Sequence, residues 1–72
     1  KNMNDITIWQ QQGYKYLIQG NYSKAIEVYE QLIEAEPDVK SHYWYLGLVL
    51  LLQGQETEAQ TTWLLAMAEG EP

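Results

Sequence analysis

The chain of 72 residues contains no cysteine and no arginine. Without cysteine, no disulfide bond can brace the fold and no thiolate can ligate a metal ion. Four basic side chains, all of them lysines, stand against ten acidic ones, which gives a formal net charge of −6 at pH 7. Phosphate backbones and anionic membrane surfaces are bound by clustered lysine and arginine. We therefore expect no nucleic-acid partner and no membrane partner.

Long apolar runs are also missing. The longest run spans residues 43–52, and these ten residues are about half of the roughly 20 that a membrane-spanning helix needs. The N-terminus is polar and lacks the apolar stretch of a secretory signal, so we expect a cytoplasmic protein. Because the sequence begins at Lys1 rather than methionine and ends on Gly70, Glu71 and Pro72, we also expect it to be part of a longer protein.

Side chains that could carry catalysis or hold a metal ion are sparse. His42 is the single histidine, whereas a zinc site needs several converging ligands. We expect His42 to lie exposed at the start of a helix. Glu27, Glu30 and Glu34 share one helix face, where we expect them to be solvated rather than engaged in acid–base chemistry. With no glycine-rich phosphate loop either, the sequence predicts no catalytic residue, no metal site, no cofactor and no enzymatic activity.

Shifting the sequence against itself by 34 residues reveals a repeat. The coinciding pairs are Trp9 with Tyr43, Gly13 with Gly47, Leu17 with Leu51, Gly20 with Gly54, Ala25 with Ala59, and Tyr29 with Trp63. The recurring glycines and alanine matter most, because small residues at fixed offsets indicate a repeated turn and a repeated close helix contact. The repeat divides the chain into a lead-in at residues 1–5, a first unit at 6–39 and a second unit at 40–72.

Each unit is expected to form two helices, because its apolar side chains recur at helical spacing. The sequence predicts an all-α fold made of two tandem antiparallel helix-turn-helix hairpins. The four helices are expected at about residues 5–19, 22–35, 39–53 and 56–69. Pro37 separates the two hairpins, since the residue before a proline disfavours the helical conformation.

Local signals mark the expected ends of these helices. Gly20 and Gly54 can adopt the left-handed conformation that stops a helix. Asn4, Asn21 and Asp38 are the expected N-caps, because their side chains can accept a hydrogen bond from the free backbone amides of a first turn.

Two further glycines lie inside the expected helices. Gly13 and Gly47 each cost their helix about 1 kcal/mol relative to alanine. Such a cost indicates that a partner helix needs the space of the missing side chain. We expect Ala25 and Ala59 to face these glycines, and the aromatic residue four positions after each alanine to fill the volume beside the contact.

The two units resemble the tetratricopeptide repeat family, whose 34-residue pattern is W-x2-L-G-x2-Y…A-x3-F…P. The matching residues are Trp9, Gly13, Tyr16, Ala25, Tyr29 and Pro37 in the first unit, and Tyr43, Leu46, Gly47, Ala59 and Trp63 in the second. The resemblance runs from about Ile6 to Pro72. Gln12 replaces the expected leucine, and Leu50 replaces the expected tyrosine. Neither departure threatens the expected fold.

The resemblance implies a scaffold in which the first helix of each unit lines a concave groove for peptides or helices of other proteins. Some members of the family clamp a C-terminal carboxylate with lysine and asparagine. The matching positions here, Gln10, Tyr14 and Tyr45, carry no cation, so we do not expect such a clamp. The expected groove suits an apolar or amphipathic protein segment. Its residues are Gln10, Tyr14, Leu17, Ser41, Trp44, Leu48 and Leu51.

A second hypothesis is self-association or a structural role. Residues 43–52 are apolar on all sides and call for burial all round. Repeat arrays normally end in a cap with a polar outer face, and the second unit has none. We therefore expect its surface to be covered by more of the parent chain, against which Trp44 and Leu48 would also pack, or by a second copy in a homodimer. The expected self-association residues are Leu50, Leu52 and Leu64.

A third hypothesis follows from the resemblance alone. Repeats of this family precede catalytic domains such as those of O-linked N-acetylglucosamine transferase-like glycosyltransferases. The chain would then be the recognition arm of a larger enzyme.

Overall fold

The computed structural model describes residues 3–68, and their side chains from Asp5 onward. It contains four helices, α1 (Met3–Ile18), α2 (Tyr22–Ala35), α3 (Lys40–Leu52) and α4 (Glu56–Ala68), and no strand within the described residues. The expected all-α class is confirmed. The expected helix bounds differ from the observed ones by no more than two residues in this part of the chain.

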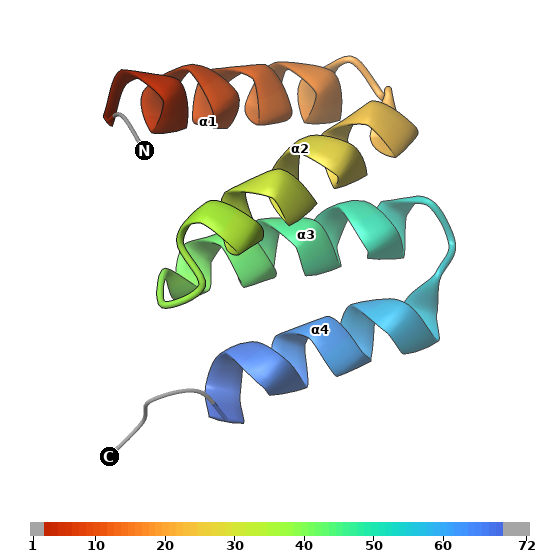
Figure 1. The fold of residues 1–72 in the computed structure, drawn as a ribbon. Coiled ribbons are helices and arrows are strands. Elements are labelled where there is room, and N and C mark those ends of the chain that lie inside the picture. The colour runs from red at the N-terminus through yellow and green to blue at the C-terminus, as the bar shows by residue number, and fades with distance from the viewer. Residues whose placement is uncertain (1–2, 69–72) are drawn as a thin grey trace.

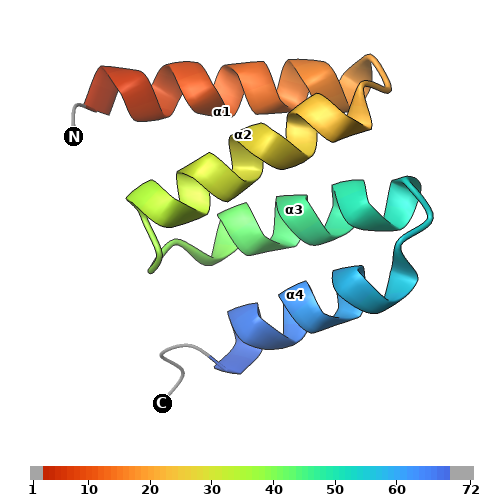
Figure 2. The same ribbon diagram turned by 45° about the vertical axis from the view of Figure 1, so that its right-hand side comes forward.

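The helices follow one another in space in their order along the chain (Figure 1). Helix α1 packs on α2, α2 on α3, and α3 on α4. Figure 2, a view turned by 45°, shows the same order. The Cα atoms fill a slab of 29 × 29 × 13 Å, so no helix lies far from the surface.

The same turn closes both hairpins. Gly20 and Gly54 have φ angles of +78° and +91°, in the region that favours glycine. After α1, the amide of Asn21 donates to the carbonyl of Tyr16 at 2.9 Å, and after α3 the amide of Gln55 donates to the carbonyl of Leu50, also at 2.9 Å. These six-to-one bonds are the mark of the Schellman motif, in which a left-handed residue ends the helix.

Of the three expected N-caps, Asn21 alone stands at the N-cap position of a helix. Helix α1 already includes Met3, so Asn4 lies within it rather than before it. Asn21 does precede α2, but its side chain makes no capping hydrogen bond. The residue before α3 is Val39 rather than Asp38, because the turn runs one residue further and closes with the Val39 amide donating to the Glu36 carbonyl at 3.1 Å.

One apolar core connects the two hairpins. It is built from the facing sides of all four helices and contains Leu17, Ala25, Val28, Tyr29, Leu32, Leu46, Val49, Leu50 and Ala59. Helices α2 and α3 contribute most of these residues, so the α2–α3 interface joins the two repeats into a single packed unit. Ala25 and Ala59 are fully buried.

The glycines inside α1 and α3 face aromatic rings directly. A Cβ atom at Gly13 would lie 2.9 Å from Cζ of Tyr29, and one at Gly47 would lie 2.5 Å from Cδ1 of Trp63. The atoms nearest to each added Cβ thus belong to the aromatic residue four positions after the alanine. Each glycine leaves room for one ring.

Candidate binding groove

A hollow of about 190 Å³ lies between α1 and α3. Its lining comes from three helices and consists of Gln10, Tyr14, Tyr29, Ser41, His42 and Tyr45. Residues of α1 and α3 form the walls, while Tyr29 reaches it from α2. We refer to it below as the tyrosine hollow.

Three tyrosine rings determine the shape of the tyrosine hollow. The ring of Tyr45 stacks on that of Tyr29, with centroids 5.4 Å apart and planes 8° from parallel. The ring of Tyr14 stands nearly perpendicular to Tyr45, at 83° and 6.5 Å. Tyr29 is buried, whereas 52% of Tyr14 and 40% of Tyr45 are exposed. A buried ring thus supports one exposed ring, and a second exposed ring meets it edge to face.

The tyrosine hollow is weakly polar. Burial, together with the neighbouring Tyr45 and Tyr14, raises the pKa of Tyr29 from 10.0 to about 12. The Tyr29 phenol is therefore neutral over the physiological pH range. Gln10 and Ser41 add an amide and a hydroxyl, and no lysine or carboxylate lines the space.

His42 is buried, contrary to the expectation that it is exposed. Only 1% of it is accessible, and its Nε2 donates to Oε1 of Glu36 at 2.8 Å. The position is inward because His42 lies four residues before Leu46 and seven before Val49, which are both in the core. That spacing is visible in the sequence and could have identified the histidine as a core residue.

The structure separates the expected groove residues into three groups. Gln10, Tyr14 and Ser41 line the tyrosine hollow together. Leu17 is a core residue with 8% exposure, because it points from α1 toward the other helices, so it offers little surface to a partner. The remaining three are exposed but lie outside the hollow: Trp44, Leu48 and Leu51.

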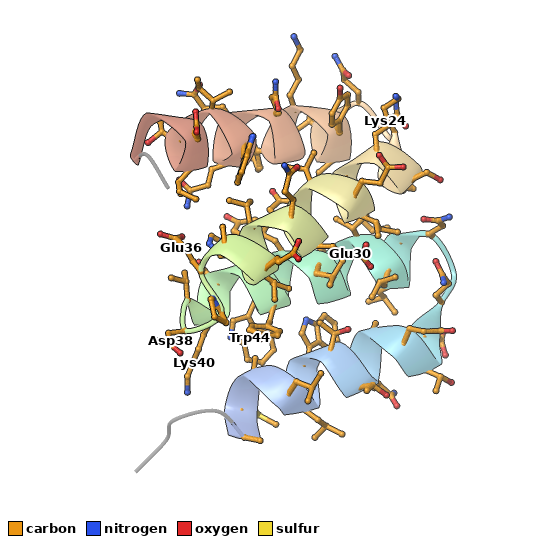
Figure 3. The ribbon with its side chains drawn as sticks, in the orientation of Figure 1. Lys24, Glu30, Glu36, Asp38, Lys40 and Trp44 are labelled. Carbon is orange, nitrogen blue, oxygen red and sulfur yellow. The ribbon has the colours of Figure 1, made fainter. Side chains whose placement is uncertain are left out.

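Trp44 belongs to the interface between α3 and α4. Its ring lies 5.9 Å from that of Trp63, and the Trp63 indole N–H donates to the Trp44 carbonyl at 3.2 Å. Figure 3 shows Trp44 on the side of α3 that faces α4. Shifted by 34 residues, Trp44, Leu48 and Trp63 occupy the places of Gln10, Tyr14 and Tyr29. The second repeat therefore presents two sides of an equivalent hollow.

Sequence reasoning missed half of the lining. His42 was expected at the surface, Tyr29 was expected only in packing, and Tyr45 only as a position where a carboxylate clamp is absent. No pattern in the sequence identifies Tyr45 as a lining residue, because its position in the hollow depends on how α3 packs across α2.

Of the expected self-association residues, Leu50 is in the core. It is 8% exposed and packs with α2 residues, so it cannot form much of a contact with a second copy. Leu52 and Leu64 are exposed, as are Leu65 and Met67 on α4.

The outer face of α2 is polar as expected, with Glu27, Glu30, Gln31 and Glu34 all exposed. Helix α1, however, also exposes Ile8, Tyr14 and Ile18. The N-terminal hairpin is therefore less completely covered than its sequence suggested.

A more open hollow of about 420 Å³ is lined by residues of α2, α3 and α4. Glu30, Glu58, Thr57 and Thr61 are among its lining residues. The hydroxyl of Thr62 is already occupied, because it donates to the Glu58 carbonyl at 2.8 Å.

Within residues 3–68, no group of three or more histidine, cysteine or acidic side chains is placed to hold a metal ion. No helix in this part of the chain is long and apolar enough to cross a membrane.

Comparison with known proteins gives one result. A family model described as tetratricopeptide repeat matches residues 11–72. No curated protein and no solved structure matches the chain.

Proposed function

The chain belongs to the tetratricopeptide repeat family, and on that premise we propose that it binds an apolar or amphipathic segment of another protein in the tyrosine hollow. Proteins of this family generally act as protein-interaction modules. No catalytic family matches the chain, and the proposal requires no chemistry from it.

The tyrosine arrangement is the observation that carries this proposal. Tyr14 and Tyr45 expose large aromatic surfaces on two different helices, and the stack on buried Tyr29 holds Tyr45 in place. Rigid aromatic side chains at the centre of an interface lose little conformational entropy on binding and often dominate affinity. Gln10 and Ser41 supply polar groups that can pair with the backbone of a bound segment.

The proposal excludes a carboxylate clamp as the mode of binding. A terminal carboxylate needs a cation or several N–H donors, and the lining contains no lysine. The nearest lysine along α3 is Lys40, which Figure 3 shows extending away from α1, on the side opposite to Glu36.

Selection from a random 12-residue peptide library displayed on phage tests the proposal. We expect peptides to be enriched on the native chain, and their affinity to fall about tenfold or more for Tyr14→Ala, because hot-spot aromatic side chains contribute at least 1–2 kcal/mol. Ile18→Ala is the matched control, since Ile18 is an exposed side chain of the same helix outside the hollow. Failure to enrich any peptide, or equal losses for both variants, would contradict the proposal.

A second candidate function is self-association through the second repeat. The tyrosine hollow of the first repeat is completed by Ser41, His42 and Tyr45 of α3, the helix that follows that repeat. The equivalent positions of the second repeat, Trp44, Leu48 and Trp63, lack such a third wall within the described residues. A helix from a second copy could supply it, which would cover the exposed leucines of α4 as well.

A further inference from the structure

We propose that the segment entering the tyrosine hollow presents an arginine, whose guanidinium lies against the rings of Tyr14 and Tyr45. This inference rests on the proposed function and names the chemistry that the hollow selects. It follows from ring geometry, from the polar groups in the lining and from the charge of the chain.

The two exposed rings form a corner suited to a flat cation. With planes at 83° and centroids 6.5 Å apart, Tyr14 and Tyr45 present two walls nearly at right angles. The face of a tyrosine ring is electronegative and attracts a cation placed within about 6 Å of its centroid. A guanidinium is planar and weakly hydrated, so it stacks on such a face more readily than an ammonium group does.

The rest of the lining offers acceptors and contains no lysine. Gln10 contributes an amide oxygen, and Ser41 contributes a hydroxyl oxygen. A guanidinium carries five N–H donors in a fixed plane, and it would otherwise lose its water without replacement. An apolar side chain cannot itself make hydrogen bonds to this amide and hydroxyl.

A carboxylate is linked to the tyrosine hollow through His42. Glu36 accepts the hydrogen bond from His42 Nε2, and 36% of its side chain remains accessible. Figure 3 shows Glu36 at the end of α2 on the side toward α1, whereas Lys40 extends the opposite way. Negative charge therefore lies close to the lining, and the neighbouring lysine is directed elsewhere.

The charge of the whole chain points in the same direction. A net charge of −6 raises the local concentration of cationic segments and repels acidic ones. The partner is thus expected to be a basic segment, with arginine as the residue that enters the hollow.

Two small probes test this inference on the full chain without a known partner. N-acetyl-arginine amide carries the cation, and N-acetyl-citrulline amide is its neutral isostere. Titration followed by NMR of the tyrosine ring protons should show saturable shifts at Tyr14 and Tyr45 with the arginine probe. The citrulline probe should bind about 5- to 30-fold more weakly, as expected for the loss of a cation–π contact. Equal shifts with both probes, or no shift at these rings, would overturn the inference.

Variants of Tyr14 test whether its ring is the group that binds the arginine probe. Tyr14→Phe keeps the ring and should retain arginine binding within about twofold, whereas Tyr14→Leu removes the ring and should weaken it about fivefold or more. Tyr14 is half exposed, so both variants should fold, and the circular dichroism spectrum verifies this. Equal binding by the Phe and Leu variants would also overturn the inference.

The two proposals fail differently. Enriched peptides that contain no arginine, and whose binding still depends on Tyr14, would overturn the arginine inference and leave the proposed function standing. A library that yields no binder would contradict the proposed function, while the titration with the two probes measures guanidinium binding independently of the library.

Discussion

Single side chains set how closely the helices of each hairpin approach. At Gly47, an added Cβ would lie 2.5 and 2.6 Å from Cδ1 and Cε2 of Trp63, distances that real contacts do not show. At Gly13 the nearest atoms are 2.9 Å away on Tyr29 and 3.2 Å away on Val28. The second hairpin therefore tolerates a larger residue less well than the first.

We predict that Gly47→Ala destabilises the chain by up to about 2 kcal/mol. Overpacking against the indole destabilises the fold by about 1–3 kcal/mol. The better helix propensity of alanine offsets about 1 kcal/mol of this cost. Gly13→Ala should change the free energy of unfolding by less than about 1 kcal/mol, because its contacts are looser. Urea unfolding followed by circular dichroism measures both values.

The Trp63→Leu background is the control for this prediction. Removing the indole removes the collision, so Gly47→Ala should no longer destabilise there and should follow helix propensity instead. An equal penalty in both backgrounds would show that Gly47 is kept for a reason other than Trp63.

The raised pKa of Tyr29 predicts that the stability of the fold depends on pH. Its pKa is about 12 in the folded chain against 10.0 for an ordinary tyrosine, because burial and the neighbouring tyrosines disfavour the phenolate. Above pH 10 the unfolded state loses this proton while the folded state keeps it, so the unfolded state binds fewer protons and stability falls as pH rises. Between pH 10 and 11, the native chain should lose about 1 kcal/mol more than Tyr29→Phe.

Unfolding in urea at pH 8, 9, 10 and 11 measures the difference between these two chains. Their stabilities should run parallel below pH 9 and diverge above pH 10. Parallel curves through pH 11 would mean that the Tyr29 phenol is not disfavoured as an anion in the folded chain.

At the scale of an element, the turn between α2 and α3 is organised by a side-chain pair. Glu36, the last residue before the turn, accepts from the buried ring of His42 in the first turn of α3. The phenol of Tyr43 adds a longer hydrogen bond of 3.4 Å to the Pro37 carbonyl. These contacts fix the entry of α3 and with it the register of Tyr45 over Tyr29.

We predict that Glu36→Ala destabilises the chain by about 1–2 kcal/mol, because a buried ring N–H then has no acceptor. Glu36→Gln should cost less, since an amide oxygen can accept the same hydrogen bond. The exposed Glu34, in the last turn of α2, is the matched control, and Glu34→Ala should stay within about 0.5 kcal/mol of the native chain. Thermal unfolding that ranks the Ala and Gln variants of Glu36 in reverse order would contradict this account.

The helices could be predicted from the sequence because their signals are local. Gly20 and Gly54 stop their helices by backbone conformation alone, and the spacing of apolar residues marks the helical faces. The capping side chains could not be predicted in the same way. Asp38 is a good cap in isolation, but the hydrogen bond between the Val39 amide and the Glu36 carbonyl moves the helix start past it.

The candidate site was predictable only in part, for a physical reason. Gln10, Tyr14 and Ser41 follow from the position of the first helix in each repeat. The stack of Tyr45 on Tyr29 depends on the angle at which α3 crosses α2, which no local pattern specifies. The burial of Leu17 and Leu50 depends on the same packing, whereas that of His42 could have been read from its helical spacing to Leu46 and Val49.

At the scale of the whole molecule, α1 and α4 are the two end helices of the slab, and both expose apolar side chains. On α4 these are Leu64, Leu65 and Met67. Terminal repeats of a solenoid need a polar outer face for solubility. An uncovered apolar face on α4 therefore favours association between copies, with a twofold dimer as the commonest form.

We predict that the isolated chain forms dimers as its concentration rises and that Leu64→Lys shifts the equilibrium to monomer. Leu64 is 60% exposed, so the lysine leaves the fold intact but places a charge where the second copy would bury an apolar surface. Ile18→Lys is the matched control, because Ile18 is at least as exposed and lies on α1, far along the chain from α4. Light scattering across a concentration series measures the mass of all three proteins. A native chain that stays monomeric would exclude self-association as a function, and an equal loss of dimer in both variants would place the interface elsewhere than on α4.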